Sequence, residues 1–251
     1  MIVPFNKRIN LKKVLMVITV LSITLSLMFS GCSANGSSKV PDGNTDARQE
    51  DRQEKAMADL KALVEGNSGV KAVMEFIDNN ISAFSKENAS KAVSMLEEVM
   101  KENLGALEED YYNQEVQSKL HGAFGFEVDL SSLDEISDSE LKALLEKTRD
   151  TGYRVETAEG MYFPVIDYGF LRKYKPYVTD DMKGYIDIMA VESWRWPAKD
   201  GALVIGWDEL IERALQQEKF IEQYPDSPKT VEIKQLYNKY VSFILYGLNN
   251  T

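Results

Sequence analysis

Apolar residues recur at helical spacing along most of this 251-residue chain, and that periodicity restricts it to a mainly α-helical fold. The pattern is clearest near the C-terminus, where residues 207–224 carry apolar side chains on one face and an almost unbroken stripe runs from Ile233 to Leu248. Because the loops between such segments are short, we expect antiparallel helices packed as a bundle. The other stripes lie within residues 57–64, 70–84, 89–100, 103–120 and 182–190.

Capping residues predict where three of the helices begin. The sequence SDSE at residues 137–140 has the form of a capping box, with Ser137 as the N-cap of the run that follows. Thr179 is expected to cap the next helix. Ser227, with Pro228 in the first helical position, is expected to cap the last helix of the chain.

One stretch, residues 153–166, breaks the helical pattern. Two β-prone runs flank the sequence AEG, so Gly160 is predicted to supply the turn of a hairpin. Pro164 cannot donate to a hydrogen-bonded ladder, which makes the second run an edge strand. The expected fold is therefore a helical bundle of antiparallel helices with one small β-hairpin. Its helical part at residues 54–152 continues, as one domain, into an aromatic-rich part at residues 153–251.

The N-terminus has the form of an export signal. Four basic residues and no acid precede an uncharged apolar run from Val14 to Phe29, and small residues then precede Cys32, the one cysteine. Small residues directly before a cysteine resemble the signal of bacterial lipoproteins. The resemblance implies that residues 1–31 are removed and that Cys32 carries two acyl chains, enough for stable anchoring on the extracytoplasmic face of the cell membrane. The alternative is a retained transmembrane anchor, for which the run is short, since a span needs about 20 apolar residues.

The segment that begins at Cys32 is too polar to form a core. Residues 33–53 are rich in Ser, Gly, Asn, Asp and charge and have almost no large apolar residue. Such a composition cannot bury enough apolar surface to fold, so we expect residues 32–53 to be a lipidated cysteine followed by a flexible tether.

Charge and residue usage exclude several classes of function. Without the signal, 25 Lys and Arg face 40 Asp and Glu, a net charge of about −15 that repels nucleic acid. A lipidated Cys32 leaves no thiol for a disulfide or a nucleophile, and a single histidine, His121, cannot build a multi-histidine metal site. We expect no metal and no cofactor. We interpret His121 as lying in a loop just after a helix, where the helix dipole favours it.

The C-terminal helix pair resembles a tetratricopeptide-type hairpin, with the sequence FIEQYPDSP at its joint. The resemblance covers about 40 residues, and no second copy occurs at the expected period of about 34 residues. A solenoid needs at least about three such repeats. A plain helical hairpin that closes the bundle is therefore the expectation.

Residues 153–207 hold eleven of the 25 aromatic residues, including all three tryptophans. Because aromatic rings bury large areas, the first interpretation is a joint at which the hairpin packs on the helices. Trp207 is expected in the core, whereas at least one of Trp194 and Trp196 is expected to be partly exposed. The alternative is a ligand groove, since cationic residues lie among the rings of an otherwise acidic protein. The candidate binding residues are Tyr168, Arg172, Tyr174, Trp194, Arg195 and Trp196.

A Glu-Ser pair at the expected end of a helix, Glu192 and Ser193, resembles the catalytic motif of lysozyme-like lytic transglycosylases. Pro197 and the pair Gly201–Ala202 belong to the same likeness. The resemblance implies that Glu192 is a partly buried acid with a raised pKa, which protonates a glycosidic oxygen. In this chain the Gly-Ala pair comes early, and the glutamine that ends the family's motif is missing.

The expected function is that of a membrane-anchored lipoprotein of the cell envelope. It would act as a non-enzymatic binding module for a cell-wall glycan, a peptide or an envelope protein. The alternative is a peptidoglycan-cleaving enzyme with Glu192 as its acid. An enzyme needs Glu192 in an open cleft with a raised pKa, whereas a binding module allows it to be exposed or ion-paired.

Overall fold

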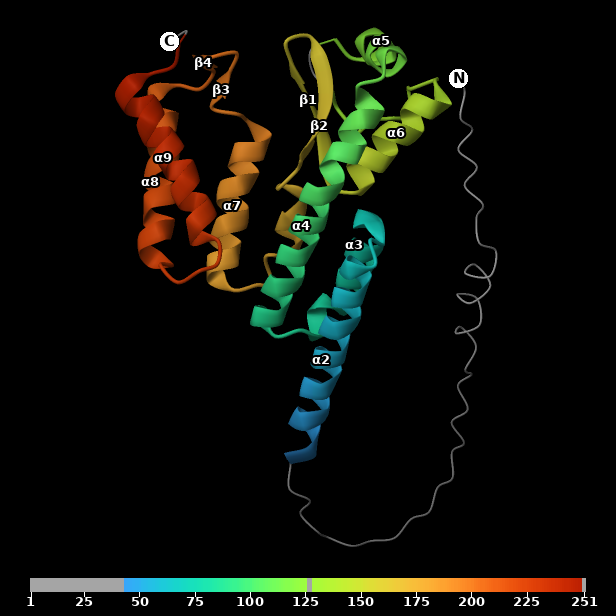
Figure 1. The fold of residues 1–251 in the computed structure, drawn as a ribbon, viewed down its shortest axis with the longest axis vertical. Coiled ribbons are helices and arrows are strands. Elements are labelled where there is room, and N and C mark those ends of the chain that lie inside the picture. The colour runs from blue at the N-terminus through green and yellow to red at the C-terminus, as the bar shows by residue number, and fades with distance from the viewer. Residues whose placement is uncertain (1–42, 126–127, 250–251) are drawn as a thin grey trace, which may run out of the picture. The chain divides into compact units, whose positions relative to one another are not determined.

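The computed structural model describes residues 43–125 and 128–249, and these residues form one unit (Figure 1). The signal-like segment 1–31, Cys32 and residues 33–42 of the predicted tether lie outside the described residues. The first described element is helix α2, Gly43–Glu65. No helix of the described ranges is long and apolar enough to cross a membrane.

The predicted tether is wrong over residues 43–53, which are helical. They continue the helix that contains the apolar stripe at residues 57–64, and Gln53 at the end of the segment contacts a distant part of the chain. The side-chain oxygen of Gln53 accepts hydrogen bonds from the backbone N–H of Ser85 (2.7 Å) and from Nδ2 of Asn88 (3.3 Å). Ser85 is the N-cap of helix α4, so α2 is held against the start of α4 by groups that the local composition does not reveal.

The N-terminal half is helical, as the apolar periodicity predicts. After α2 come α3 (Gly69–Asn80), the short helix η1 (Ile81–Ala83), α4 (Lys86–Tyr111), α5 (Gln114–Ala123) and α6 (Ser139–Asp150). The run at 103–120, predicted as one helix, is two, because α4 continues to Tyr111 and Asn113 starts α5. The Asn113 side chain accepts a hydrogen bond from the N–H of Glu115, which competes with helical continuation.

Two of the three predicted N-caps are wrong, and one is confirmed. The N-cap of α6 is Asp138 instead of Ser137, and its carboxylate accepts from the N–H groups of the next turn. The last helix, α9 (Thr230–Tyr246), begins after Lys229, although the Ser227 hydroxyl does accept from the N–H of Lys229 (3.3 Å). Thr179 is confirmed as the N-cap of α7 (Asp180–Trp194).

The predicted hairpin is confirmed. Strands β1 (Tyr153–Ala158) and β2 (Met161–Ile166) pair antiparallel, with Tyr153 opposite Ile166 and Val155 opposite Pro164. Gly160 has φ +76° in the turn, a conformation that favours glycine. β2 packs on α4, and the short helix η2 (Phe170–Tyr174) leads on to α7.

A second, smaller hairpin was not predicted. Strands β3 (Ala198–Lys199) and β4 (Ala202–Leu203) pair antiparallel around Asp200 and Gly201, both with positive φ. An Asp-Gly pair is a common two-residue hairpin turn, but the flanking runs are too short to show strand alternation. This hairpin connects α7 to α8 (Trp207–Gln223).

The fold contains two hydrophobic cores within the described residues. The large core contains side chains from each of the helices from α2 through α7 and from the β1–β2 hairpin. It also includes Phe220 of α8 and Ile233 of α9. The small core lies between α8 and α9 and is formed by Ile205, Leu210, Ala214 and Tyr240. Trp207 was expected in the core, but it is 48% exposed, because the polar side chains Arg213 and Gln217 occupy buried positions on α8.

A buried charge network connects α4 to the start of α9. The carboxylate of Glu97 is fully buried and contacts the ammonium groups of Lys229 and Lys101. It also accepts hydrogen bonds from the hydroxyls of Tyr168 (2.7 Å) and Tyr185 (2.5 Å). Burial alone would raise the pKa of Glu97, but Lys229 and the hydrogen bonds to Lys101 and Tyr185 outweigh it and hold this pKa below its usual value. The carboxylate therefore stays ionised in the interior.

Candidate groove beside the tryptophans

An open groove of about 1010 Å³ lies between strand β1 and the segment that connects α7 to α8. One wall is made by residues 153–157 of β1 together with Arg149. The other wall is made by Trp194, Arg195, Trp196, Lys199 and Val204. Residues 128–131, Asp167 and Phe170 complete the lining. The groove therefore brings together two segments that the sequence keeps about forty residues apart.

The two tryptophans owe their position to the way in which α7 ends. Arg195 has extended backbone, and Trp196 precedes Pro197, a position that disfavours the helical conformation. Trp194 and Trp196 both line the groove, as expected if the segment is extended. The side chain of Trp194 is 76% exposed, whereas Trp196 is half-buried, with its ring centroid 5.8 Å from that of Phe163. Trp194 is thus the groove residue with most ring surface free for a ligand.

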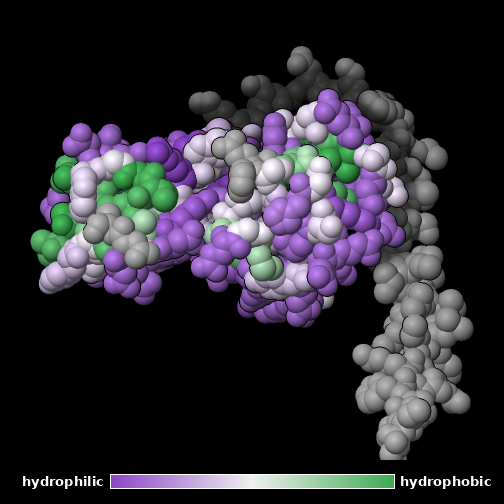
Figure 2. Space-filling model, turned by 90° about the horizontal axis from the view of Figure 1, so that it is seen from above, coloured by the Kyte–Doolittle hydropathy of each residue, from purple (hydrophilic) through white to green (hydrophobic). Residues whose placement is uncertain are grey.

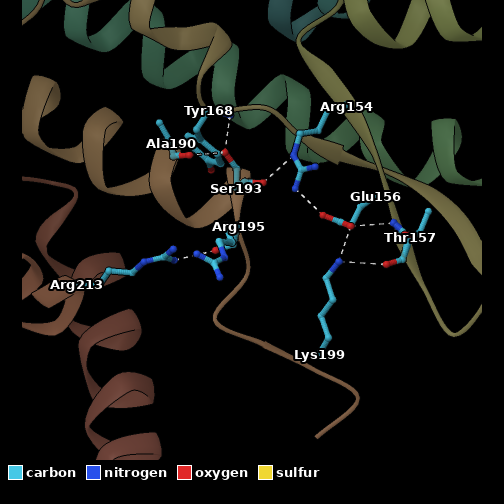
Figure 3. A network of polar contacts seen from close by, with 9 residues as sticks. All are labelled: Arg154, Glu156, Thr157, Tyr168, Ala190, Ser193, Arg195, Lys199 and Arg213. Carbon is cyan, nitrogen blue, oxygen red and sulfur yellow. Dashed lines mark hydrogen bonds and ion pairs between the residues drawn. The ribbon is translucent and has the colours of Figure 1, made fainter. Parts of the chain in front are cut away.

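Three charged side chains, Arg154, Glu156 and Lys199, connect the two walls of the groove (Figure 3). Glu156 of β1 accepts hydrogen bonds from Nη2 of Arg154 (2.7 Å) and from Nζ of Lys199 (2.6 Å), which comes from β3. Nε of Arg154 also donates to the carbonyl of Ser193 at the end of α7 (2.7 Å). These contacts tie β1 to the opposite wall. They also hold the three side chains in fixed positions.

The pKa of Glu156 is low for a physical reason. Burial by itself would raise this pKa, but the hydrogen bonds from Lys199, from the N–H of Thr157 and from Arg154 outweigh it and lower the pKa of the carboxyl. Glu156 is therefore ionised at neutral pH and cannot serve as a proton donor there. Asp129, also in the lining, has its pKa lowered by the hydrogen bonds from the backbone and hydroxyl of Ser131.

Arg195 is anchored to the start of α8. Its guanidinium donates to Glu209 (3.0 Å) and to the carbonyl of Val204 (3.2 Å), and its own carbonyl accepts from Nη1 of Arg213 (2.8 Å). The side chain remains about half-exposed. It can therefore present a fixed positive charge at the rim of the groove, next to Trp194.

Glu192 does not line the groove. Its side chain is 11% exposed and lies between α7, α8 and α9, where the hydroxyl of Tyr240 donates to it (2.6 Å) and Nη1 of Arg213 lies 3.5 Å away. Burial raises the pKa of Glu192, and Tyr240 and Arg213 offset this only in part. The pKa direction is that of a general acid, but the carboxyl is covered and ion-paired.

The other candidate binding residues lie elsewhere. Tyr168 is buried and donates to Glu97, and Tyr174 is buried in the large core. Arg172 is exposed beside Asp187, with 3.7 Å between Nε and Oδ1. The aromatic cluster is thus divided, since Tyr168 and Tyr174 belong to a joint in the core while Trp194 and Trp196 line a groove.

Arg154, Glu156 and Lys199 were not predicted as site residues from the sequence. A signal for the first two existed, because charges two residues apart in a predicted strand point to the same face. Lys199 could not be found in this way, since its role depends on the unpredicted β3–β4 hairpin. His121 lies inside the last turn of α5, not in a loop after it, and its Nε2 is 2.9 Å from the carbonyl of Gly160.

Comparison with known proteins gives no further identification. No protein-family model, no curated protein and no solved structure matches this chain. Within the part of the chain that the structure describes, no group of three or more His, Cys, Asp and Glu side chains is placed to hold a metal ion.

Proposed function

We propose that this protein is a lipid-anchored lipoprotein of the cell envelope, and that its groove binds a cell-wall glycan without cleaving it. The observation that carries the proposal is Trp194, a large aromatic side chain that is 76% exposed at the rim of a groove. Exposed apolar rings beside a cavity are typical of binding sites. The flat face of an indole can stack on the C–H face of a sugar ring.

The polar part of the groove supports the same class of ligand. Arg154, Glu156 and Lys199 hold one another in place, so ordering them costs little when a ligand binds. Charged side chains form strong hydrogen bonds to hydroxyl groups. Arg195 adds a positive charge that suits the carboxylates of a wall glycan and its peptide substituents.

The membrane anchor is tested separately. Replacing Cys32 with alanine should release the protein from the membrane fraction, or leave it with its signal uncleaved, because the acylated side chain is gone. The measurement is fractionation of cells fed with a radiolabelled fatty acid, followed by blotting. If label does not enter the unmodified protein, the lipid anchor is disproved and a retained transmembrane segment takes its place.

Glycan binding should depend on Trp194. We expect Trp194→Ala to weaken binding of soluble peptidoglycan fragments by about 30-fold, because a binding hot spot contributes about 2 kcal/mol or more. The thermal midpoint should hardly change, since the side chain is mostly exposed. Isothermal titration calorimetry and thermal unfolding measure the two effects.

Tyr112→Ala is the matched control for that experiment. Tyr112 is also an exposed aromatic residue, at 57%, but it does not line the groove. Its loss should leave both binding and stability unchanged. Equal binding by the unmodified protein, Trp194→Ala and Tyr112→Ala would show that the groove is not the glycan site.

The alternative of glycan cleavage has one observation in its favour, the raised pKa of Glu192. Its position argues against the role, because a proton donor must reach the glycosidic oxygen and Glu192 is covered by Tyr240 and Arg213. Incubating the same fragments with the unmodified protein and with Glu192→Gln separates the two functions. Release of shorter glycans by the unmodified protein alone would replace binding with catalysis.

A further inference from the structure

The α8–α9 hairpin exposes apolar side chains on one side. On α8, Trp207, Ile211 and Leu215 follow one another at a spacing of four residues, and each is more than 40% exposed. Residues at this spacing lie on one face of a helix. On α9, Leu245 is 65% exposed and Val241, one turn earlier, is half-buried. Figure 2, which looks onto the end of the molecule that carries β3 and β4, shows apolar surface gathered over that end of the α8–α9 hairpin.

One hydrogen bond shows that the two rows of side chains border the same face. The hydroxyl of Tyr237 on α9 donates to Oε1 of Glu218 on α8 (3.0 Å). Glu218 continues the α8 row one turn beyond Leu215, and Tyr237 precedes Val241 by one turn on α9. We call this surface the hairpin face. It consists of Trp207, Ile211, Leu215, Glu218 and Glu222 on α8 and Lys234, Tyr237, Asn238, Val241 and Leu245 on α9.

The hairpin face has an apolar end and a charged end. Because α8 and α9 are antiparallel neighbours, Trp207 and Ile211 lie at the same end as Leu245 and Val241. At the other end, the α8 row holds Glu218 and Glu222 and the α9 row holds Lys234. Within the hairpin face, the acidic residues therefore lie only in the α8 row, and the basic residue lies in the α9 row.

We propose that a second copy of this chain covers the hairpin face, related by a two-fold axis parallel to the helices. Such an axis places α8 of one copy on α9 of the other and keeps like ends together. Counting residues from that shared end sets Trp207 against Leu245, Ile211 against Val241 and Leu215 against Asn238. The same count sets Glu218 of each copy against Lys234 of the other, with Glu222 one turn further along α8, so the apolar and the charged parts are both self-complementary.

The size of the face fits a stable dimer. Each helix has 17 residues, which gives a length of about 25 Å, and two helices side by side are about 20 Å wide. A flat surface of these dimensions is about 500 Å², and protruding side chains bring its accessible area toward the roughly 800 Å² that each partner buries in a standard interface. Contiguous exposed apolar patches of this kind mark association sites on soluble domains.

Photo-cross-linking of the full chain in its membrane tests the proposal. A photoreactive amino acid at Asn238 should give an adduct of twice the chain's mass, with the cross-link mapped to residues near Leu215 of the second copy. The same amino acid at Gln235, on another side of α9, should give none. Ile211→Glu and Leu245→Glu should each reduce the adduct at least tenfold. Tyr246→Glu should not, although Tyr246 is 84% exposed, because it points away from the face.

A charge reversal distinguishes this pairing from any other contact on the same surface. Lys234→Glu should also reduce the adduct, since it sets acid against acid, and adding Glu222→Lys should restore it. Circular dichroism of each variant checks that the helices are intact. An adduct with a different protein, no adduct at all, or a loss that Glu222→Lys does not restore would overturn the proposed dimer.

Discussion

Replacing Lys229 with methionine is expected to lower the free energy of unfolding by about 3 to 5 kcal/mol, the cost of leaving a buried charge without its partner. The carboxylate of Glu97 is fully buried, and Lys229 is its closest cation. Lys101 also contacts Glu97, but its side chain is one-third exposed. Urea denaturation followed by circular dichroism measures the change.

Lys173→Met is a matched control. The ammonium group of Lys173 also contacts a carboxylate, that of Asp78 at 2.9 Å, and lies 4.5 Å from the centroid of an aromatic ring, as that of Lys229 does. It differs in being exposed, and exposed ion pairs contribute about 1 kcal/mol or less. Similar losses in the two variants would mean that burial of Glu97 is not what makes the network important.

The same network predicts a pH dependence. The pKa of Glu97 is lower in the folded protein than in the unfolded chain, so its contribution to stability is complete above about pH 4.5 and is lost as the pH falls through the folded value. In Lys229→Met the cation that lowers this pKa most is gone. Because the folded and unfolded pKa values of Glu97 then lie closer together, the stability lost on acidification below about pH 4.5 should be smaller in the variant than in the unmodified protein.

Gly152→Ala is expected to cost about 2 to 5 kcal/mol for two reasons. Gly152 has φ +79°, a left-handed conformation that costs other residues about 1 to 2 kcal/mol. An added Cβ would also lie 2.9 Å from Cε of Met100 and 2.9 Å from Cδ1 of Phe170, and overpacking of a core costs about 1 to 3 kcal/mol. Thermal and urea unfolding should agree on the loss.

Two further glycines separate these causes. Gly160 has φ +76° but open space around it, so Gly160→Ala should cost only the backbone part. Gly105 lies in α4 with nothing near an added Cβ, and Gly105→Ala should stabilise the protein by about 0.5 to 1 kcal/mol. If Gly152→Ala costs no more than Gly160→Ala, the packing around Gly152 is looser than the structure indicates.

Local patterns were enough for most of the fold. The helical stripes and the β1–β2 hairpin follow from periodicities within single segments, and both are confirmed. The predicted tether failed because residues 43–53 continue the helix of the next apolar stripe, and Gln53 also contacts the start of α4, more than thirty residues away. Trp207 was misplaced because the buried strip of α8 includes Arg213 and Gln217, which a search for apolar periodicity counts as surface residues.

Only about half of the candidate site could be predicted from the sequence. Trp194, Arg195 and Trp196 were found because they are close together in an aromatic segment. Arg154, Glu156 and Lys199 come from two strands whose pairing across the groove is a tertiary contact. The Glu97 network was even less predictable from the sequence, because Glu97 and Lys229 are 132 residues apart and neither is unusual in its own segment.

In the function proposed above, helix α2 would also limit how far the groove can reach from the membrane anchor. From Gly43 onward the chain is a rod that is held to α4, and α2 begins at the end of the unit opposite the β3–β4 hairpin (Figure 1). With the proposed anchor at Cys32, only the ten residues 33–42 separate the lipid from that rod, and ten residues span at most about 35 Å. The start of α2 would then stay within that distance of the lipid, and the groove, which includes Lys199 of β3, would lie at the far end of the unit from that start.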